Sequence, residues 1–208
     1  YNIILGGEGS NTLDLQGKLS HHEIAYDGET LYLRNKAGEM TLAKDISTIS
    51  SSESFLLVFN KSVQHQVTDD GLQTGSTLTQ YAASVRGDDQ NNNLYGEKGS
   101  WLFGFDGDDV LRGAGQNVFV GGEGDDLLIG AGHDNTYLFS GNFGNDTIYN
   151  FGKTDTLLFM GVEGATTGDY HDVAFEQNGD LVINFGINSV TLVGVNMDML
   201  SDTQVVLA

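Results

Sequence analysis

The 208-residue chain has no cysteine and no proline, and it has only 9 basic residues against 29 acidic ones, for a net charge of −20. Without cysteine there are no disulfides, no thiolate zinc sites and no cysteine nucleophile. The acid excess repels phosphate groups, so nucleic acid and anionic membrane surfaces are not expected partners. No stretch approaches the roughly 18 consecutive apolar residues of a transmembrane segment.

The usual signatures of catalysis are also missing. The five histidines form no HExxH or comparable zinc spacing, and the chain has neither a GxSxG elbow nor a phosphate-binding GxxxxGK[ST] loop. The acid pairs Asp108-Asp109 and Asp125-Asp126 recur at matching positions, which favours ion ligation over the two-carboxylate chemistry of glycosidases. We therefore expect no enzyme activity here; any catalytic domain of a parent protein would lie outside this chain.

Glycine, by contrast, is abundant, with 29 residues, and it recurs periodically over residues 87–149. Short glycine- and acid-rich segments alternate with apolar triplets. One large apolar residue falls near the end of each unit, at steps of 8 to 11 residues: Leu94, Phe103, Leu111, Phe119, Leu128, Tyr137 and Ile148. This period predicts stacked repeats, because each unit is too small to bury its own apolar side chain.

One unit illustrates the chemistry. GGEGDD (121–126) predicts a turn and LLI (127–129) a short strand with Leu128 inward. Backbone carbonyls exposed by such a turn, with a carboxylate at its sixth position, form an all-oxygen ligand set that suits Ca²⁺ better than softer transition metals. These units resemble the GGxGxDxUx nonapeptide of the RTX (repeats-in-toxin) family.

The resemblance implies an all-β fold, a parallel β-roll of glycine-rich nonapeptide repeats, here flanked by antiparallel β elements. In such a roll two repeats complete one coil, and several Ca²⁺ ions lie between turns stacked on the same side. The turns then sort into two rows. Sixth positions are Asn92, Asp109, Asp126 and Asp146 in one row, and Trp101, Asn117 and Asn135 in the other. Tryptophan cannot ligate Ca²⁺ and an amide brings no charge, so we predict metal binding on the first row.

The main candidate ligands are the carboxylates of Asp109, Asp126 and Asp146, with Asp126 central because it has a partner turn on either side. Further candidates are Asp106, Asn92 and, as a weaker one, Asp89, which lies opposite Asp106 in the third position of its turn. Asp155 either caps the last ion site or serves a plain turn. Five glycines would offer carbonyls or permit the turn: Gly104, Gly107, Gly122, Gly124 and Gly144.

The chain reads as four segments. Residues 1–15 resemble the end of an upstream repeat coil, and residues 16–86 an antiparallel β unit with a connecting loop. Residues 87–159 form the predicted roll, and residues 160–208 a C-terminal β cap with a possible secretion signal. In the second segment, FLLVF (55–59) predicts a core strand, and residues 69–86 predict a loop or short helix.

The resemblance also implies a function. The chain would be a secreted or cell-surface module that passes through the type I secretion machinery, folds on Ca²⁺ after export, and stabilises or presents the rest of a larger exoprotein, such as a toxin. Two alternatives stay open. One is a glycan- or peptide-binding module of an adhesin, in which residues 16–86 or the surface around Trp101 would contact the ligand, with Trp101 as the aromatic to test for exposure. The other is the non-catalytic C-terminal part of a secreted protease, lipase or polysaccharide-modifying enzyme.

Overall fold

The computed structural model describes residues 2–15, 18–55, 59–74, 76–165 and 168–208. Apart from three short 3-10 turns, the regular elements of these residues are all strands. None of the helices in the described ranges has the length and apolar character needed to cross a membrane. The chain divides into two compact units, residues 1–82 and residues 83–208, which are taken separately below.

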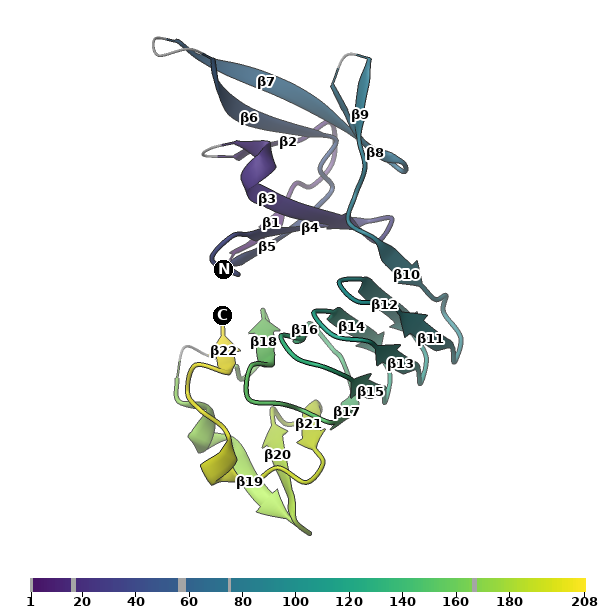
Figure 1. The fold of residues 1–208 in the computed structure, drawn as a ribbon, viewed down its shortest axis with the longest axis vertical. Helices are drawn as coiled ribbons and strands as arrows, with labels where there is room; N and C mark the ends of the chain where they lie inside the picture. Colours follow the sequence, from purple (N-terminus) through teal and green to yellow (C-terminus); the bar gives the residue numbers. More distant parts are fainter. Residues whose placement is uncertain (1, 16–17, 56–58, 75, 166–167) are drawn as a thin grey trace. The chain divides into compact units, whose positions relative to one another are not determined.

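The second unit contains two ladders of strands (Figure 1). The first is parallel throughout: β10 (Ser84–Arg86), β12 (Trp101–Asp106), β14 (Val118–Glu123), β16 (Thr136–Ser140), β18 (Thr156–Met160) and β22 (Val205–Leu207). The other has five parallel strands: β11 (Asn93–Gly96), β13 (Val110–Gly113), β15 (Leu127–Gly130), β17 (Asn145–Tyr149) and β21 (Ser189–Leu192). Up to β18 the chain alternates between the ladders, so each strand pair is one coil of a parallel β-roll. The predicted fold class is confirmed.

Each short strand turns one large apolar side chain into the roll. Leu111, Leu128 and Ile148 pair in register along one ladder, and Leu102, Phe119, Tyr137 and Leu157 along the other. All seven are fully buried in a single cluster. Phe119 and Tyr137 stack with ring centroids 4.9 Å apart. Burial of this row is the main favourable term available to so glycine-rich a segment.

Two predictions about the start of the roll are wrong. Leu102, rather than Phe103, belongs to the core cluster of the roll, although Phe103 is also buried, and Trp101 is the first residue of β12 rather than the sixth residue of a turn. The reason is turn length: Gly96 pairs with Gly113 and Trp101 with Val118, so four residues link the strands at both levels. Ser100 therefore lies level with Asn117. Trp101, the aromatic named above to test for exposure, is 0% exposed.

Strands beyond β18 complete both ladders at the end of the roll, with β22 beside β18 and β21 beside β17. The strands β20 (Asp180–Asn184) and β19 (Ala174–Gln177) extend the second ladder in antiparallel fashion. Asn178 and Gly179 connect them, with φ of 57° and 92°, as an Asn-Gly hairpin turn requires. Leu181, Ile183 and Phe185 join the core cluster. Two 3-10 turns, η2 (Tyr170–Asp172) and η3 (Met197–Met199), complete this region.

The first unit has two sheets. One holds β1 (Asn2–Leu5), β5 (Met40–Lys44), β4 (Thr30–Asn35) and β3 (His22–Tyr26); the other holds β2 (Thr12–Leu15), β6 (Thr48–Phe55), β7 (Phe59–Thr68), β8 (Gly71–Thr74) and β9 (Thr77–Thr79). A 3-10 turn, η1 (Leu19–His21), precedes β3. Only the β1–β5 and β2–β6 pairs of these sheets are parallel. The strand pair of residues 1–15 therefore stacks as one coil on β5 and β6.

Two further predictions are corrected in this region. The apolar run 55–59 is not one strand: Phe55 ends β6 and Phe59 begins β7, and these two strands pair antiparallel. Residues 56–58 lie outside the described residues. Residues 69–86 are not a loop or helix but contain the short strands β8, β9 and β10. Their short polar sequences show no clear period, and cross-strand pairing supplies the order that local pattern does not.

Candidate metal centre

Four turns on one side of the roll stack in a row: residues 87–92, 104–109, 121–126 and 141–146. Each leads from a strand of the first ladder to a strand of the second. The fourth position of the last three turns is glycine, and Gly107, Gly124 and Gly144 have φ of 106°, 128° and 80°. An L side chain rarely adopts these angles, so glycine at these positions lets the turn form. We call these turns the aspartate row.

The carboxylates at the sixth positions of this row are buried and held in place by the neighbouring turn. Asp109, Asp126 and Asp146 are each 1–2% exposed. One oxygen of each, Oδ1, accepts a backbone hydrogen bond from the preceding turn: from Asn92 N to Asp109 at 2.7 Å, from Asp109 N to Asp126 at 2.8 Å, and from Asp126 N to Asp146 at 2.7 Å. The three carboxylates therefore form a continuous line along the roll.

The other carboxylate oxygen of each residue has no hydrogen-bond partner in the described part of the chain. Oδ2 of Asp109, Asp126 and Asp146 is buried and unpaired. Burial raises the pKa of Asp109, and it raises the pKa of Asp126 to about 7 and that of Asp146 to about 9. The backbone hydrogen bonds oppose this rise and the neighbouring acids add to it. A buried, negatively charged oxygen without a partner is costly, and a cation would remove that cost.

Backbone oxygens lie beside these carboxylates with no side chain between. A Cβ on Gly104 would fall 2.1 Å from Asp109 Oδ2 and 2.4 Å from the carbonyl oxygen of Gly121. A Cβ on Gly121 would fall 2.0 Å from Asp126 Oδ2. On Gly122 and Gly124 it would meet the carbonyl oxygens of the preceding turn at 1.8 and 2.3 Å. Carboxylate and carbonyl oxygens thus share a glycine-lined space, and this donor set fits Ca²⁺.

Side chains alone do not complete the set. No three His, Asp or Glu side chains converge on a common point within the described residues. A Ca²⁺ ion in this space would therefore need carbonyl oxygens of the turns as further ligands, which is how all-oxygen Ca²⁺ sites are commonly built.

The predicted site residues do not all come together. Asp109, Asp126 and Asp146, Asn92 and the five predicted glycines all lie in the aspartate row. The side chains of Asp89 and Asp106, at third positions of this row, are exposed. Asp155 lies on the other side of the roll, between β17 and β18, and both its oxygens are paired: Oδ1 accepts from Asn135 N at 2.8 Å and Oδ2 from Gly152 N at 2.9 Å.

Sequence reasoning missed a second series of hydrogen bonds between turns, made by the side chains at the fifth positions of the aspartate row. The backbone N of Asp108 donates to Asn91 Oδ1 at 3.1 Å, that of Asp125 to Asp108 Oδ1 at 3.0 Å, and that of Asn145 to Asp125 Oδ1 at 2.8 Å. These bonds run in the opposite direction to those of the sixth positions. The repeated Asp-Asp pair in the sequence was the available signal. Its first member, Asp108 or Asp125, accepts a backbone hydrogen bond from the next turn and does not line the buried space.

Comparison with known proteins bears on the fold. No family model matches the chain, and no curated protein matches it significantly. Among solved structures, it is similar to the crystal structure of the extracellular lipase LipA from Serratia marcescens, with 50% sequence identity and a TM-score of 0.92 over 100% of this chain. The chain has an RTX-type parallel β-roll. It spans 34% of the length of that lipase.

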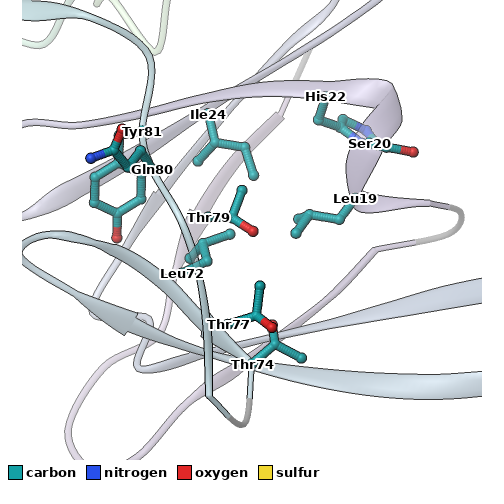
Figure 2. Close-up of a pocket in the computed structure, with 10 residues that line it drawn as sticks. All are labelled: Leu19, Ser20, His22, Ile24, Leu72, Thr74, Thr77, Thr79, Gln80 and Tyr81. Carbon is teal, nitrogen blue, oxygen red and sulfur yellow. The ribbon is translucent and has the colours of Figure 1, made fainter.

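A pocket in the first unit differs in character from the aspartate row. Its volume is about 420 Å³, and Figure 2 shows Leu19, Ile24 and Leu72 beside the hydroxyls of Thr74, Thr77 and Thr79. None of the residues lining it is acidic, so it does not offer charged oxygen ligands to a cation.

Proposed function

We propose that this chain is a Ca²⁺-binding, non-catalytic part of a secreted lipase-like exoprotein. The observation that carries the proposal is the line of three buried carboxylates, each with one oxygen unpaired. Ca²⁺ would bind between adjacent turns of the aspartate row, with Asp109, Asp126 and Asp146 as charged ligands and glycine carbonyls as neutral ones. Asp126 would serve ions on both of its sides.

Folding and metal binding are coupled in this proposal. Without metal, the buried carboxylates and the net charge of −20 oppose the compact state. Ions that bind the folded roll but not the unfolded chain stabilise it by RT ln(1 + [L]/Kd). Extracellular Ca²⁺ modules bind at about 10⁻⁴–10⁻³ M, well above cytosolic Ca²⁺. The roll would therefore stay loose inside the cell, pass through the type I machinery, and fold once secreted.

The similarity to an extracellular lipase favours the lipase alternative over the adhesin one. Ester hydrolysis would then belong to parts of a parent protein beyond this chain. Trp101, the only tryptophan, is buried, so it cannot serve as an aromatic platform for a glycan. Residues 87–159 would hold the ions, residues 160–208 would cap the roll, and the last residues would carry the possible secretion signal.

Far-UV circular dichroism during a Ca²⁺ titration from excess chelator tests the proposal. We expect a cooperative rise of the β signal with Ca²⁺ and none with Mg²⁺, and equilibrium dialysis should find more than one ion per chain. A spectrum that is β-rich in chelator and unchanged by Ca²⁺ would contradict coupled folding. An ester-hydrolysis assay on the Ca²⁺-loaded chain should be blank; activity above that of the denatured protein would contradict the non-catalytic assignment.

A further inference from the structure

The turns on the opposite side of the roll close without unpaired carboxylates. Counted from the glycine that begins each of the first three and from Asn150 in the last, they comprise residues 96–100, 113–117, 130–135 and 150–155, and we call them the amide row. Level with the aspartates of the other side lie Ser100, Asn117, Asn135 and Asp155, all buried. None of their side-chain atoms is among the buried unpaired ones found in the described residues. The difference between the rows is therefore chemical, because both are equally enclosed.

Asn135 shows how an amide closes such a turn. Its Oδ1 accepts a hydrogen bond from Asn117 N at 3.1 Å, as the aspartate Oδ1 atoms do across the roll. Its Nδ2 donates to the carbonyl oxygen of Ala131, the second residue of its own turn, at 3.2 Å. A Cβ on Gly130 would lie 3.0 Å from this nitrogen, just as a Cβ on Gly121 would meet Asp126 Oδ2. The amide nitrogen thus takes the place of the unpaired carboxylate oxygen.

The same arrangement recurs in the first unit. In the turn GGEGSN (6–11), Asn11 Nδ2 donates to the carbonyl oxygens of Gly7 at 2.8 Å and Asp45 at 3.0 Å. Gly7 is again the second residue of the turn, and a Cβ on Gly6 would lie 2.7 Å from Asn11 Nδ2. Asn11 thereby joins carbonyls of two stacked turns. The two instances have different neighbours, so the amide bond belongs to the turn type and not to one location.

Asn117 reaches the same result with a different side-chain orientation. Its Nδ2 donates to the carbonyl oxygens of Glu97 at 2.6 Å and Ser100 at 3.1 Å, both in the preceding turn, while its Oδ1 accepts from Gly115 N at 2.7 Å. The backbone N–H donor facing Oδ1 sets the orientation of the amide, since an NH₂ group there would face another donor. The Asn117 amide nitrogen thus bridges the carbonyl oxygens of Glu97 and Ser100, in the place where a cation would otherwise bind them.

From these contacts we propose that the last residue of each turn decides which turns take Ca²⁺: asparagine supplies an internal nitrogen in place of the cation, and an aspartate whose Oδ2 has no backbone donor, unlike that of Asp155, leaves the place for the ion. Asn135 and Asn11 are then specificity-determining residues that keep their turns independent of metal. The inference rests on the proposed function for its Ca²⁺ part. Its hydrogen-bond part rests on the contacts described above alone.

The test uses Asn135→Asp, Asn135→Ala and the reverse change Asp126→Asn, each compared with wild type. Asn135→Asp places a carboxylate beside Asp155 of the next turn, as Asp126 lies beside Asp146. Urea unfolding in EDTA and in saturating Ca²⁺ gives stability, and equilibrium dialysis gives ions bound per chain. We expect Asn135→Asp to unfold at lower urea than wild type in EDTA, to bind one additional Ca²⁺, and to regain stability with Ca²⁺.

Asn135→Ala should also lose stability in EDTA, but Ca²⁺ should raise its midpoint no more than that of wild type. An Asn135→Asp variant as stable as wild type in EDTA, or with the Ca²⁺ response of Asn135→Ala, would overturn the inference. If Asn135→Asp does not fold at any Ca²⁺ concentration, Asp126→Asn decides: it must bind fewer ions than wild type and be no less stable in EDTA. A wild-type chain that binds no Ca²⁺ would overturn the proposed function, and the EDTA comparison would then judge the hydrogen-bond part by itself.

Discussion

Asp126→Asn should have opposite effects on stability with and without calcium. The substitution keeps Oδ1, which accepts the hydrogen bond from Asp109 N, and replaces the unpaired Oδ2 by an amide nitrogen. It removes a buried negative charge without changing the side-chain shape. In chelator the variant should be more stable than wild type, and in saturating Ca²⁺ it should be less stable.

The size of the first effect follows from the pKa of Asp126. Burial raises it from 3.8 to about 7. A folded-state pKa above the unfolded value means that the folded chain keeps a proton that the unfolded chain has released. Stability is therefore fully present below about pH 4 and is lost as the pH rises to about 7. About three pH units at roughly 1.4 kcal/mol each give an upper limit of about 4 kcal/mol, which Asp126→Asn should recover near pH 8 in chelator.

The second effect follows from ion binding. At about 10 mM Ca²⁺, a site with a Kd of about 10⁻⁴–10⁻³ M contributes roughly 1.4–2.7 kcal/mol to stability. Asp126 faces a neighbouring turn on both sides, so the variant should lose part or all of two such contributions. The loss is comparable to the gain in chelator, so the order of stability of the two proteins should reverse when Ca²⁺ is added.

Urea unfolding measures both effects. Trp101 is the only tryptophan and is buried in β12, so its fluorescence reports on the roll, and far-UV circular dichroism reports on the whole chain. Asp89→Asn, which removes an exposed carboxylate from the same row of turns, is the matched control and should change either midpoint little. An Asp126→Asn variant less stable than wild type in chelator, or one stabilised by Ca²⁺ as much as wild type, would refute the reasoning.

Three further predictions concern pH, backbone and core. In chelator, wild-type stability should fall as the pH rises from about 4 to about 9, because the folded chain retains protons on Asp126 and Asp146, whose pKa values are about 7 and about 9. Saturating Ca²⁺ should flatten this dependence of stability on pH. Equal slopes with and without Ca²⁺ would contradict the prediction. Gly122→Ala should destabilise the roll far more than Gly141→Ala in urea unfolding. Both glycines have positive φ, so the strain of an L side chain is common to both. A Cβ on Gly122 would lie 1.8 Å from the carbonyl oxygen of Phe105, whereas a Cβ on Gly141 would meet nothing within 4 Å. Similar losses of stability in the two variants would count against the close stacking of turns. Leu128→Ala should lower the free energy of unfolding by about 2–5 kcal/mol and shift the midpoint of Ca²⁺-induced folding to a higher Ca²⁺ concentration. Ile129→Ala, at a half-buried position, should have a smaller effect on both. An unshifted midpoint in Leu128→Ala would show that folding and metal binding are not coupled.

Some features were predictable because they depend on local periodicity. The spacing of Leu111, Phe119, Leu128, Tyr137 and Ile148 identified five inward residues of the roll, since a strand with one inward residue per repeat repeats its pattern in the sequence. Glycine at the fourth position of three turns and aspartate at the sixth likewise placed Asp109, Asp126 and Asp146 in one row. Residues 69–86 lacked such a pattern, and their strands were missed.

Turn length and hydrogen-bond pairing were decided only in the folded chain. GEKGSW reads as a six-residue turn, but register with the level above makes it one residue shorter, which moves Leu102 inward and places Trp101 in a strand. Asp155 looks like a further ligand, yet both its oxygens accept backbone hydrogen bonds, whereas Oδ2 of Asp126 has no partner. By itself the sequence determined the repeat, the β-roll and the acid-bearing side of it, because these follow from which residue occupies each position of a short period. Which carboxylate and amide oxygens accept a backbone hydrogen bond depends on atoms 17 to 20 residues apart along the chain, and only the stacking of coils brings those together.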